Sequence, residues 1–419
     1  MNLINSAYLE IKYDLKERIL EKRLPHINLF SISLNFMKIF KPEKFENDTS
    51  ITVQTSFEYA GKSESLWFSL SQKYRNMLSL QAQDAFVVAL LILAMEQGED
   101  VYIQGSMSEK LYYNLSHYGI HLLCINMPSL SKIKLFPEKL YSDVHTHSNA
   151  GAATGFSGGV DSFCVIANHY YEDVPEHFKM SHILFNNVGS HNMGGRRLFR
   201  ERYETLQPAA RELGLPFIAI DSNLNDHVPF NFKSTHTVRN TAVALLLQNA
   251  IKKFYYASGF SYKDCQIAAR NNISDFDPVI LPLLSTETID CIASGWQYTR
   301  VEKTKKVSEL DLSYRYLDVC VNSSNAGNCS ACWKCLRTLL TFDILGKIEN
   351  YNAVFDLEKY FAVKNRYVRT ILGSKYPLHR EILQLAERNK IELDSHINKN
   401  FFSRNYFKAY SIIDRFKKK

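Results

Sequence analysis

The sequence lacks the features of a membrane or secreted protein. The longest apolar run, 85–95, has about half of the ~20 residues that span a bilayer, and no basic segment followed by an apolar run opens the chain. A formal charge of +7 over 419 residues is mild and gives no argument for nucleic-acid binding. We therefore expect a cytoplasmic protein without a membrane or nucleic-acid partner.

Disulfide bonds are not expected either, although the chain has eight cysteines. Cytosolic thiols stay reduced, so the cysteines need another explanation. Four of them crowd into residues 320–335, which indicates a metal site. Cys265 and Cys291 stand apart without a histidine base nearby in the sequence, and we interpret them as ordinary thiols.

A chain of this length predicts two or three domains. Residues 1–145 are expected to form an N-terminal α/β domain of their own, and the polar segment 142–152, which contains His145 and His147, is the expected boundary. The expected elements of this domain are a helical lead-in at 1–25, helices at 78–97 and 108–119, and strands at 51–59, 100–105 and 119–126.

Strand-like and helix-like segments alternate from 146 to 345, which predicts a doubly wound parallel sheet. In such sheets a ligand binds beyond the carboxyl ends of the strands. Residues 346–419 are predicted to form a helical C-terminal region. Its basic, aromatic end (399–419) is interpreted as a solvated, partly docked helix, with a contact surface for an acidic partner or RNA as the alternative.

A glycine-rich loop follows the first strand of this second domain. Glycines let the backbone approach an anion, and the helix that follows offers free N–H groups and the positive end of its dipole. A Walker loop would also need a lysine, whose absence disfavours transfer of the terminal phosphate. The loop predicted to bind phosphate consists of Ser157, Gly158, Gly159, Val160, Asp161 and Ser162.

The cysteine cluster has the spacing of a metal knuckle. Four thiolates close a tetrahedral shell around zinc, so we predict a structural Zn²⁺ site, with an iron–sulfur cluster as the main alternative. The predicted ligands are Cys320, Cys329, Cys332 and Cys335.

The Ser-Gly-Gly-x-Asp-Ser loop resembles the signature of the PP-loop N-type ATP pyrophosphatases. Together with the cysteines and Arg337, it is similar to the 7-cyano-7-deazaguanine synthase family over residues 152–345. The resemblance implies a PP-loop (HUP-like) fold, ATP with Mg²⁺, and zinc near a base pocket. It also implies that AMP is transferred to the carboxylate of 7-carboxy-7-deazaguanine and that pyrophosphate is released.

The resemblance also suggests roles for individual residues. Ser157, Asp161 and Arg239 would be catalytic, and Asn240 would join Arg239 and the loop at the nucleotide. Tyr262, Asp264 and Arg337 would contact the base. The sequence departs from the family where Lys263 replaces a proline, where Gln266 replaces an arginine, and within the cysteine motif.

The amine that receives the activated base is left open by the sequence. The resemblance extends to relatives found with antiphage systems, which implies that the base is joined to a protein amine, and the extra N-terminal domain would suit docking of such a protein. The alternatives are nitrile synthesis with ammonia and a PP-loop tRNA-modifying enzyme. A non-catalytic nucleotide-binding protein fits less well with the intact loop, and a homodimer is compatible with the sequence.

Overall fold

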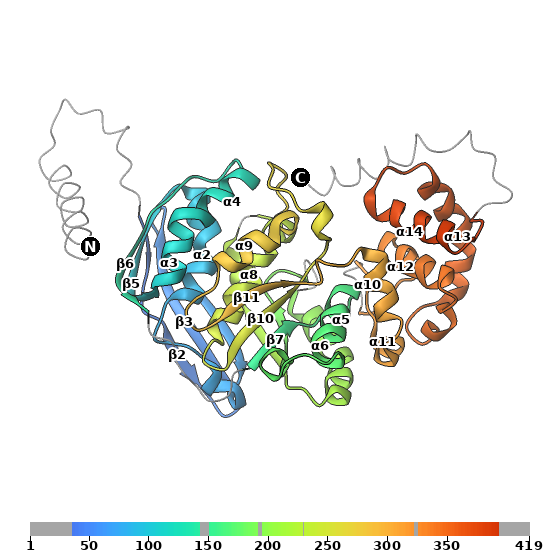
Figure 1. Ribbon diagram of the computed structural model, residues 1–419. Helices are drawn as coiled ribbons and strands as arrows, with labels where there is room; N and C mark the ends of the chain where they lie inside the picture. Colours follow the sequence, from blue (N-terminus) through green and yellow to red (C-terminus); the bar gives the residue numbers. More distant parts are fainter. Residues whose placement is uncertain (1–35, 143–150, 192–194, 229, 322–325, 394–419) are drawn as a thin grey trace, which may run out of the picture.

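The computed structural model describes residues 36–142, 151–191, 195–228, 230–321 and 326–393 (Figure 1). The predicted lead-in at 1–25, the histidines His145 and His147, and the tail 399–419 lie outside these residues. No helix in the described ranges is both long and apolar enough to cross a membrane.

A parallel sheet forms the centre of the fold, as predicted from 146–345. Its chain order is interrupted once, because the strands lie in the spatial order β11-β10-β7-β8-β9. The chain thus builds outward on one side of β7 and then crosses to the other, so the switch point lies between β7 and β10. The strands are β7 (Gly151–Gly155), β8 (His182–Asn187), β9 (Phe217–Ser222), β10 (Ile251–Ala257) and β11 (Asp290–Ser294).

The two faces of this sheet belong to two apolar clusters. Leu184 and Phe254 point into one cluster, whereas their neighbours Ile183 and Tyr255 point into the other. Because successive side chains of a strand alternate, both faces must be covered by other elements. The helices and turns between β7 and β11 are α5 (Val160–Ile166), η4 (Ala167–Tyr171), η5 (Glu176–Phe178), α6 (Gly195–Leu213), α7 (Leu224–His227), α8 (Phe232–Leu246), η7 (Tyr262–Asp264), η8 (Ile273–Phe276) and α9 (Asp277–Leu283).

The N-terminal strands extend the same sheet. Strand β4 pairs antiparallel with β9, with Phe68 opposite Ser222, and the order continues β4-β3-β1-β5-β6. Strand β2 pairs with β3 outside this order, so the sheet has eleven strands within the described residues. The expected N-terminal α/β unit therefore has no sheet of its own. The strands are β1 (Phe36–Ile39), β2 (Glu43–Glu46), β3 (Ser50–Tyr59), β4 (Lys62–Ser71), β5 (Asp100–Ser108) and β6 (Leu135–Tyr141).

The hydrophobic core is also shared across the expected boundary at 142–152. The apolar helix α2 (Asp84–Gln97) is buried almost all round and packs on α8. Both helices contribute to one apolar cluster, which also includes residues of η2 (Gln72–Met77) and α9. Removing residues 1–145 would therefore expose a large apolar surface of the rest of the chain.

One predicted strand is wrong. Residues 119–126 do not continue as a strand but form helix α4 (Ile120–Asn126), which follows α3 (Glu109–Asn114) and the π-turn η3 (Leu115–Gly119). Gly119 has helical dihedrals and does not end the helix. Leu115, Ile120, Leu123 and Met127 are buried, which is helical spacing, and this burial overrides the strand propensity of the segment.

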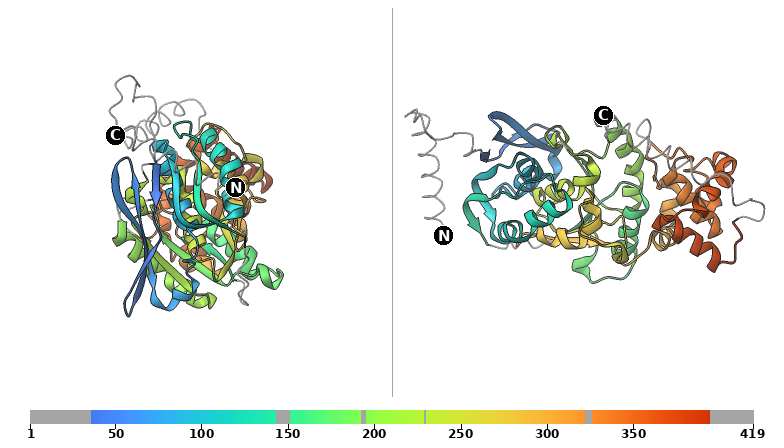
Figure 2. Two further views of the ribbon diagram at one scale, coloured as in Figure 1. Left: turned by 90° about the vertical axis from the view of Figure 1, so that its left-hand side faces the viewer. Right: turned by 90° about the horizontal axis from the view of Figure 1, so that it is seen from above.

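The chain after β11 is helical, and its described residues 346–393 agree with the helical C-terminal region predicted for 346–419. Figure 2 shows it as a compact group at the end of the molecule opposite the N-terminal strands. Helix α14 contacts both α10 and α12. The elements are α10 (Arg300–Val307), α11 (Asp311–Tyr316), α12 (Trp333–Ile344), η9 (Ile348–Tyr351), α13 (Leu357–Leu372) and α14 (Pro377–Arg388).

Candidate functional site

The predicted phosphate loop connects β7 to α5 at the switch point of the sheet. Gly158 has a φ of +73°, and a Cβ atom there would lie 2.8 Å from Leu206 Cδ2. A side chain at this position would therefore be strained and would clash. Gly159 is the N-cap of α5, which leaves the first backbone N–H groups of the helix available to a ligand.

The serines of the loop differ in exposure. Ser157 is exposed, and its Oγ accepts a hydrogen bond from the Gly159 N–H at 3.4 Å. Ser162 is buried and donates its hydroxyl to the Gly159 carbonyl at 3.0 Å. Val160 packs into the core. Ser157 is therefore the serine of this loop that faces solvent and can reach a ligand.

Asp161 lies between two cations of helix α10. Arg300 Nη2 is 2.8 Å from Asp161 Oδ2, and Lys303 Nζ is 3.6 Å from Asp161 Oδ1. Burial alone would raise the pKa of Asp161, but the charges of Arg300 and Lys303 outweigh it and lower the pKa. The carboxylate is therefore ionised, and it holds two cations beside the phosphate loop.

The same two cations bind the segment that follows β10. Lys303 Nζ donates to the Ser258 carbonyl at 2.8 Å and to Ser258 Oγ at 2.7 Å, and Arg300 Nη2 donates to the Gly259 carbonyl at 3.2 Å. The carboxyl ends of β7 and β10 are thus linked by one helix. Arg300 and Lys303 were not predicted as site residues, although the capping box Thr299-x-x-Glu302 signals the helix that carries them.

Helix α12 adds two further cations. Arg337 is buried and Lys334 is partly exposed. Burial, followed by the charges of Arg337 and Arg300, lowers the pKa of Lys334. Burial and the charge of Arg300 lower the pKa of Arg337 to about 10. Four cations and one carboxylate therefore share this region, which favours an anionic ligand.

Arg239 has a different role from the predicted one. Its five N–H donors are all used inside the protein, so none remains for an α-phosphate. Gly189 makes room for it, because a Cβ atom there would lie 2.6 Å from Arg239 Nη1. The acceptors are Thr235 Oγ1 at 2.7 Å, the Val188 carbonyl at 3.0 Å, Asn225 Oδ1 at 2.9 Å, the Val228 carbonyl at 3.4 Å and the Phe230 carbonyl at 2.8 Å.

Asn240 lies one residue further along α8, where β8 ends. Its Oδ1 accepts from Asn186 Nδ2 at 3.0 Å, and its Nδ2 donates to the His236 carbonyl at 2.7 Å. Arg239 and Asn240 both lie at the carboxyl edge of the parallel strands, and the phosphate loop lies at the same edge. Contact between Asn240 and a nucleotide remains a prediction.

A buried polar network that the sequence analysis missed lies under α8. His236 Nδ1 is 2.5 Å from Tyr256 Oη, and Thr237 Oγ1 donates to Asp277 Oδ1 at 2.6 Å. Asp277 is only 1% exposed, and burial raises its pKa to about 7. Its Oδ2 has no hydrogen-bond partner in the described part of the chain. No sequence motif marks this network, because its members come from α8, β10 and α9.

Two of the three residues predicted to contact a base, Tyr262 and Asp264, lie on the turn after β10, whereas Arg337 lies on α12. Tyr262 is 60% exposed, and its ring lies 6.0 Å from that of Trp296. Asp264 caps its own turn, because its Oδ2 accepts from Ser261 Oγ at 2.7 Å. One of its oxygens is thus committed locally. Cys265 and Cys291 have pKa values raised by burial, Cys291 to about 12, as for ordinary thiols.

The four cysteines of the predicted metal site converge. Their sulfur atoms all lie within 4.8 Å of one another, and Cys332 Sγ is 3.5 Å from Cys335 Sγ. Four sulfurs at ~2.3 Å from a tetrahedral zinc would be about 3.8 Å apart, so the cluster fits a metal such as zinc. The Cys332 N–H also points at Cys329 Sγ at 3.3 Å, as in a metal knuckle.

The metal loop is tied to the phosphate loop and to the C-terminal helices. Asn328 accepts from the Val319 N–H at 2.9 Å and donates to the Leu317 and Val354 carbonyls at 2.7 and 3.0 Å. The Asp318 N–H donates to the Gly158 carbonyl at 2.7 Å. A metal bound here would therefore fix both the bend at Gly158 and the start of α12.

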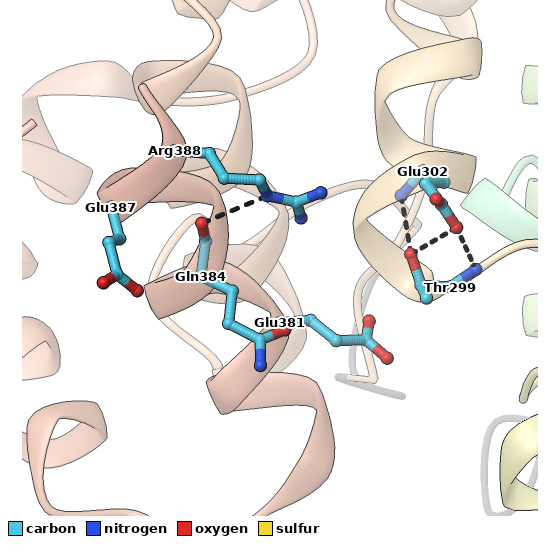
Figure 3. Close-up of a pocket in the computed structure, with 6 residues that line it drawn as sticks. All are labelled: Thr299, Glu302, Glu381, Gln384, Glu387 and Arg388. Atoms are coloured by element: carbon cyan, nitrogen blue, oxygen red, sulfur yellow. Dashed lines mark hydrogen bonds between the residues drawn. The ribbon is translucent and has the colours of Figure 1, made fainter. Parts of the chain in front are cut away.

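A separate cavity of about 320 Å³ lies between α10 and α14 (Figure 3). Glu381 points from α14 toward the start of α10, where it accepts from the Arg300 N–H at 2.9 Å and pairs with Lys263 Nζ at 3.0 Å. Helix α14 thereby anchors the helix that carries Arg300. The cavity is lined by Thr299, Glu302, Glu381, Gln384, Glu387 and Arg388.

No family model matches the chain, and a search of curated proteins finds no match to it. What can be said of its chemistry therefore depends on the motifs and on the geometry described above.

Proposed function

We propose that the protein adenylates a carboxylate on a 7-deazaguanine-type base, releases pyrophosphate, and passes the activated base to an amine. The observation that carries this proposal is the loop 157–162 at the switch point, with Asp161 positioned between Arg300 and Lys303. This arrangement combines a glycine bend, a free helix start and fixed cations. Such a combination suits a polyphosphate.

The proposed reaction has two steps. A carboxylate oxygen of the base forms a bond to the α-phosphorus of ATP, the bond to the β-phosphate oxygen breaks, and pyrophosphate leaves. The amine nitrogen then bonds to the acyl carbon, AMP leaves with one carboxylate oxygen, and the nitrogen loses a proton. The loop N–H groups, Arg300 and Lys303 would stabilise the negative charge that gathers on the departing pyrophosphate.

Zinc enters the proposal as a structural ion. Cys320, Cys329, Cys332 and Cys335 would hold it, and a closed shell of four thiolates leaves no position for a substrate. Mg²⁺ would arrive as the counter-ion of ATP. Asp161 is not assigned to Mg²⁺, because its oxygens already face Arg300 and Lys303.

We propose a protein amine as the acceptor, with the N-terminal residues 1–145 as its docking region. The support is that α4 reaches the loop after the turn at 262–264: Asn126 Nδ2 donates to the Ala268 and Asn272 carbonyls at 3.0 and 3.3 Å. A partner bound on α4 would thus lie near that loop. Mass spectrometry of co-expressed proteins would detect a base-sized adduct, whereas nitrile formed from ammonia alone would contradict a protein acceptor.

The direct test of the reaction type is chromatography of the nucleotide products with ATP and 7-carboxy-7-deazaguanine. We expect AMP and pyrophosphate from the wild type and none from Asp161→Asn, because Arg300 and Lys303 lose their counter-charge at the loop. Asp226→Asn, which changes an exposed carboxylate on α7, serves as the matched control and should leave the products unchanged. ADP as the sole product would refute the proposal.

A further inference from the structure

Arg337 is a buried cation whose guanidinium is only partly hydrogen-bonded within the described part of the chain. It lies in the second turn of α12 and is 5% exposed, and neither its Nε nor its Nη1 has a partner among the residues that the structure describes. Tyr367 on α13 is also buried, with 8% of its surface exposed, and its hydroxyl likewise has no hydrogen-bond partner among the described residues. Buried donors of this kind are nearly always satisfied, so the pair calls for a missing acceptor.

Among the residues that the structure describes, no carboxylate forms an ion pair with Arg337. Asp161, the carboxylate whose charge reaches Arg337, is already paired with Arg300 and Lys303. Burying an uncompensated guanidinium is costly, and Arg300 adds like-charge repulsion. The apo protein therefore keeps an unfavourable arrangement that an anionic ligand would relieve.

One aromatic ring lies over this guanidinium, and further rings lie on the two helices that pack against α12. The Arg337 Cζ lies 5.0 Å from the centre of the Trp333 ring, and Trp333 is 37% exposed. His379 meets the rings of Tyr367 and Tyr376 edge to face, at 6.0 and 5.1 Å. Helices α12, α13 and α14 pack against one another, so flat aromatic surfaces and the unpartnered donors of Arg337 and Tyr367 come from one group of helices.

We propose that Arg337 and Tyr367 bind the carboxylate of a flat ring compound, which packs against Trp333. This inference rests on the proposed function and deepens it, because it assigns the acyl substrate to a subsite that the C-terminal helices help to build. The region 346–393 would then be part of the active site.

A carboxylate fits this subsite better than a phosphate of ATP does. The phosphates already have the loop, Arg300 and Lys303, whereas the planar fork of a guanidinium matches a planar carboxylate. Aromatic walls favour a ring over a pyrophosphate chain. An ATP phosphate remains the other source of negative charge, and the experiment separates the two.

The test is calorimetric titration of the full-length, zinc-loaded protein with two matched pairs of probes. The first pair is 7-carboxy-7-deazaguanine and 7-deazaguanine, and the second is indole-3-carboxylate and indole, which does not depend on the identity of the base. ATP is titrated in parallel. The variants are Arg337→Met, Arg337→Lys and Tyr367→Phe, with the exposed Arg369→Met on α13 as the control.

We expect Arg337→Met to weaken binding of both carboxylates by about 10- to 100-fold and to leave the carboxylate-free partners unchanged. Tyr367→Phe should weaken it by about 5-fold. ATP affinity should change by less than a factor of three in every variant, and Arg369→Met should behave as the wild type. Arg337→Lys should recover part of the loss, because it restores charge without the fork.

Three results would overturn the inference: a wild type that binds no carboxylate probe, Arg337→Met with unchanged carboxylate affinity, or a selective loss of ATP affinity in that variant. Failure of the proposed function would appear differently. If the wild type binds the carboxylates through Arg337 but forms no AMP, the proposed subsite stands and the proposed adenylation is refuted.

Discussion

The two buried arginines, Arg239 and Arg337, are 1% and 5% exposed but have opposite environments. Arg239 donates five hydrogen bonds, to acceptors that lie just after β8, in the segment between β9 and α8, and in the first turn of α8. Arg337 donates none from its Nε and Nη1. Burial lowers the pKa of both to about 10, so burial and pKa do not separate them.

What separates these arginines is whether their donors are satisfied. A satisfied buried guanidinium holds its surroundings together, whereas an unsatisfied one destabilises the apo protein and is explained by a ligand. The comparison assigns a structural role to the Arg239 region and a binding role to the Arg337 region. Each of the following predictions would sharpen or break this assignment.

Removal of the metal should have the largest effect, and it should be confined to the Arg337 side. The start of α12 is formed by two of the clustered cysteines, whereas α8 contains none of them. Because metal binding is coupled to folding, we expect chelation or Cys335→Ser to cost several kcal/mol. Hydrogen exchange should show lost protection in α12 and α13. Equal loss in α8 would mean that the two regions are not independent.

Arg239→Met should destabilise the protein by about 3–5 kcal/mol, because five buried acceptors lose their donor. Chemical unfolding measures this loss. Gly189→Ala should act in the same direction, since the added Cβ would displace Arg239 Nη1. Arg369→Met is the matched control and should be neutral. If Arg239→Met were as stable as the wild type, Arg239 would have no structural role, and its predicted role at the nucleotide would again be the better explanation.

Arg337→Met should change the stability of the ligand-free protein in the opposite direction from Arg239→Met. Without ligand we expect a stability that is equal to the wild type or about 1–2 kcal/mol higher, because an uncompensated charge is removed from the interior. Thermal unfolding with and without 7-carboxy-7-deazaguanine measures it, and the ligand should raise Tm only when Arg337 is present. Clear destabilisation of the apo variant would show that Arg337 has a structural partner.

Asp277 provides a smaller test on the Arg239 side. Burial raises its pKa from the usual 3.8 to about 7, so the folded state binds this proton more tightly than the unfolded state does. Its contribution to stability is therefore complete below pH 4 and is lost as the pH rises toward 7 and above. We expect the wild type to lose about 1–2 kcal/mol between pH 5 and 7 from this group. Asp277→Asn should show no such loss. Equal pH profiles would mean that the carboxylate has a compensating partner.

The features of the site that could be predicted from sequence are those made by neighbouring residues. The bend at Gly158, the start of α5 and the convergence of four cysteines all follow from short-range spacing. The alternation of strands and helices likewise predicted the central parallel sheet. Each of these patterns is formed by residues that are close in the sequence, so it depends little on the rest of the chain.

Contacts between distant segments could not be predicted in this way. The pairing of β4 with β9, the ion pairs of Asp161 with Arg300 and Lys303, and the five hydrogen bonds of Arg239 all join residues from different elements. The residue pair Arg239–Asn240 illustrates the difficulty. Its position at the sheet edge is visible in the sequence, but the acceptors that occupy Arg239 come from segments before and after β9.

The most direct test of the account is transfer of isotopic oxygen from substrate to nucleotide. The protein would be incubated with ATP, an amine and 7-carboxy-7-deazaguanine labelled with oxygen-18 in its carboxylate, and AMP would be analysed by mass spectrometry. Attack of the carboxylate on the α-phosphorus predicts AMP that carries one oxygen-18. Unlabelled AMP, or ADP in its place, would contradict carboxylate adenylation.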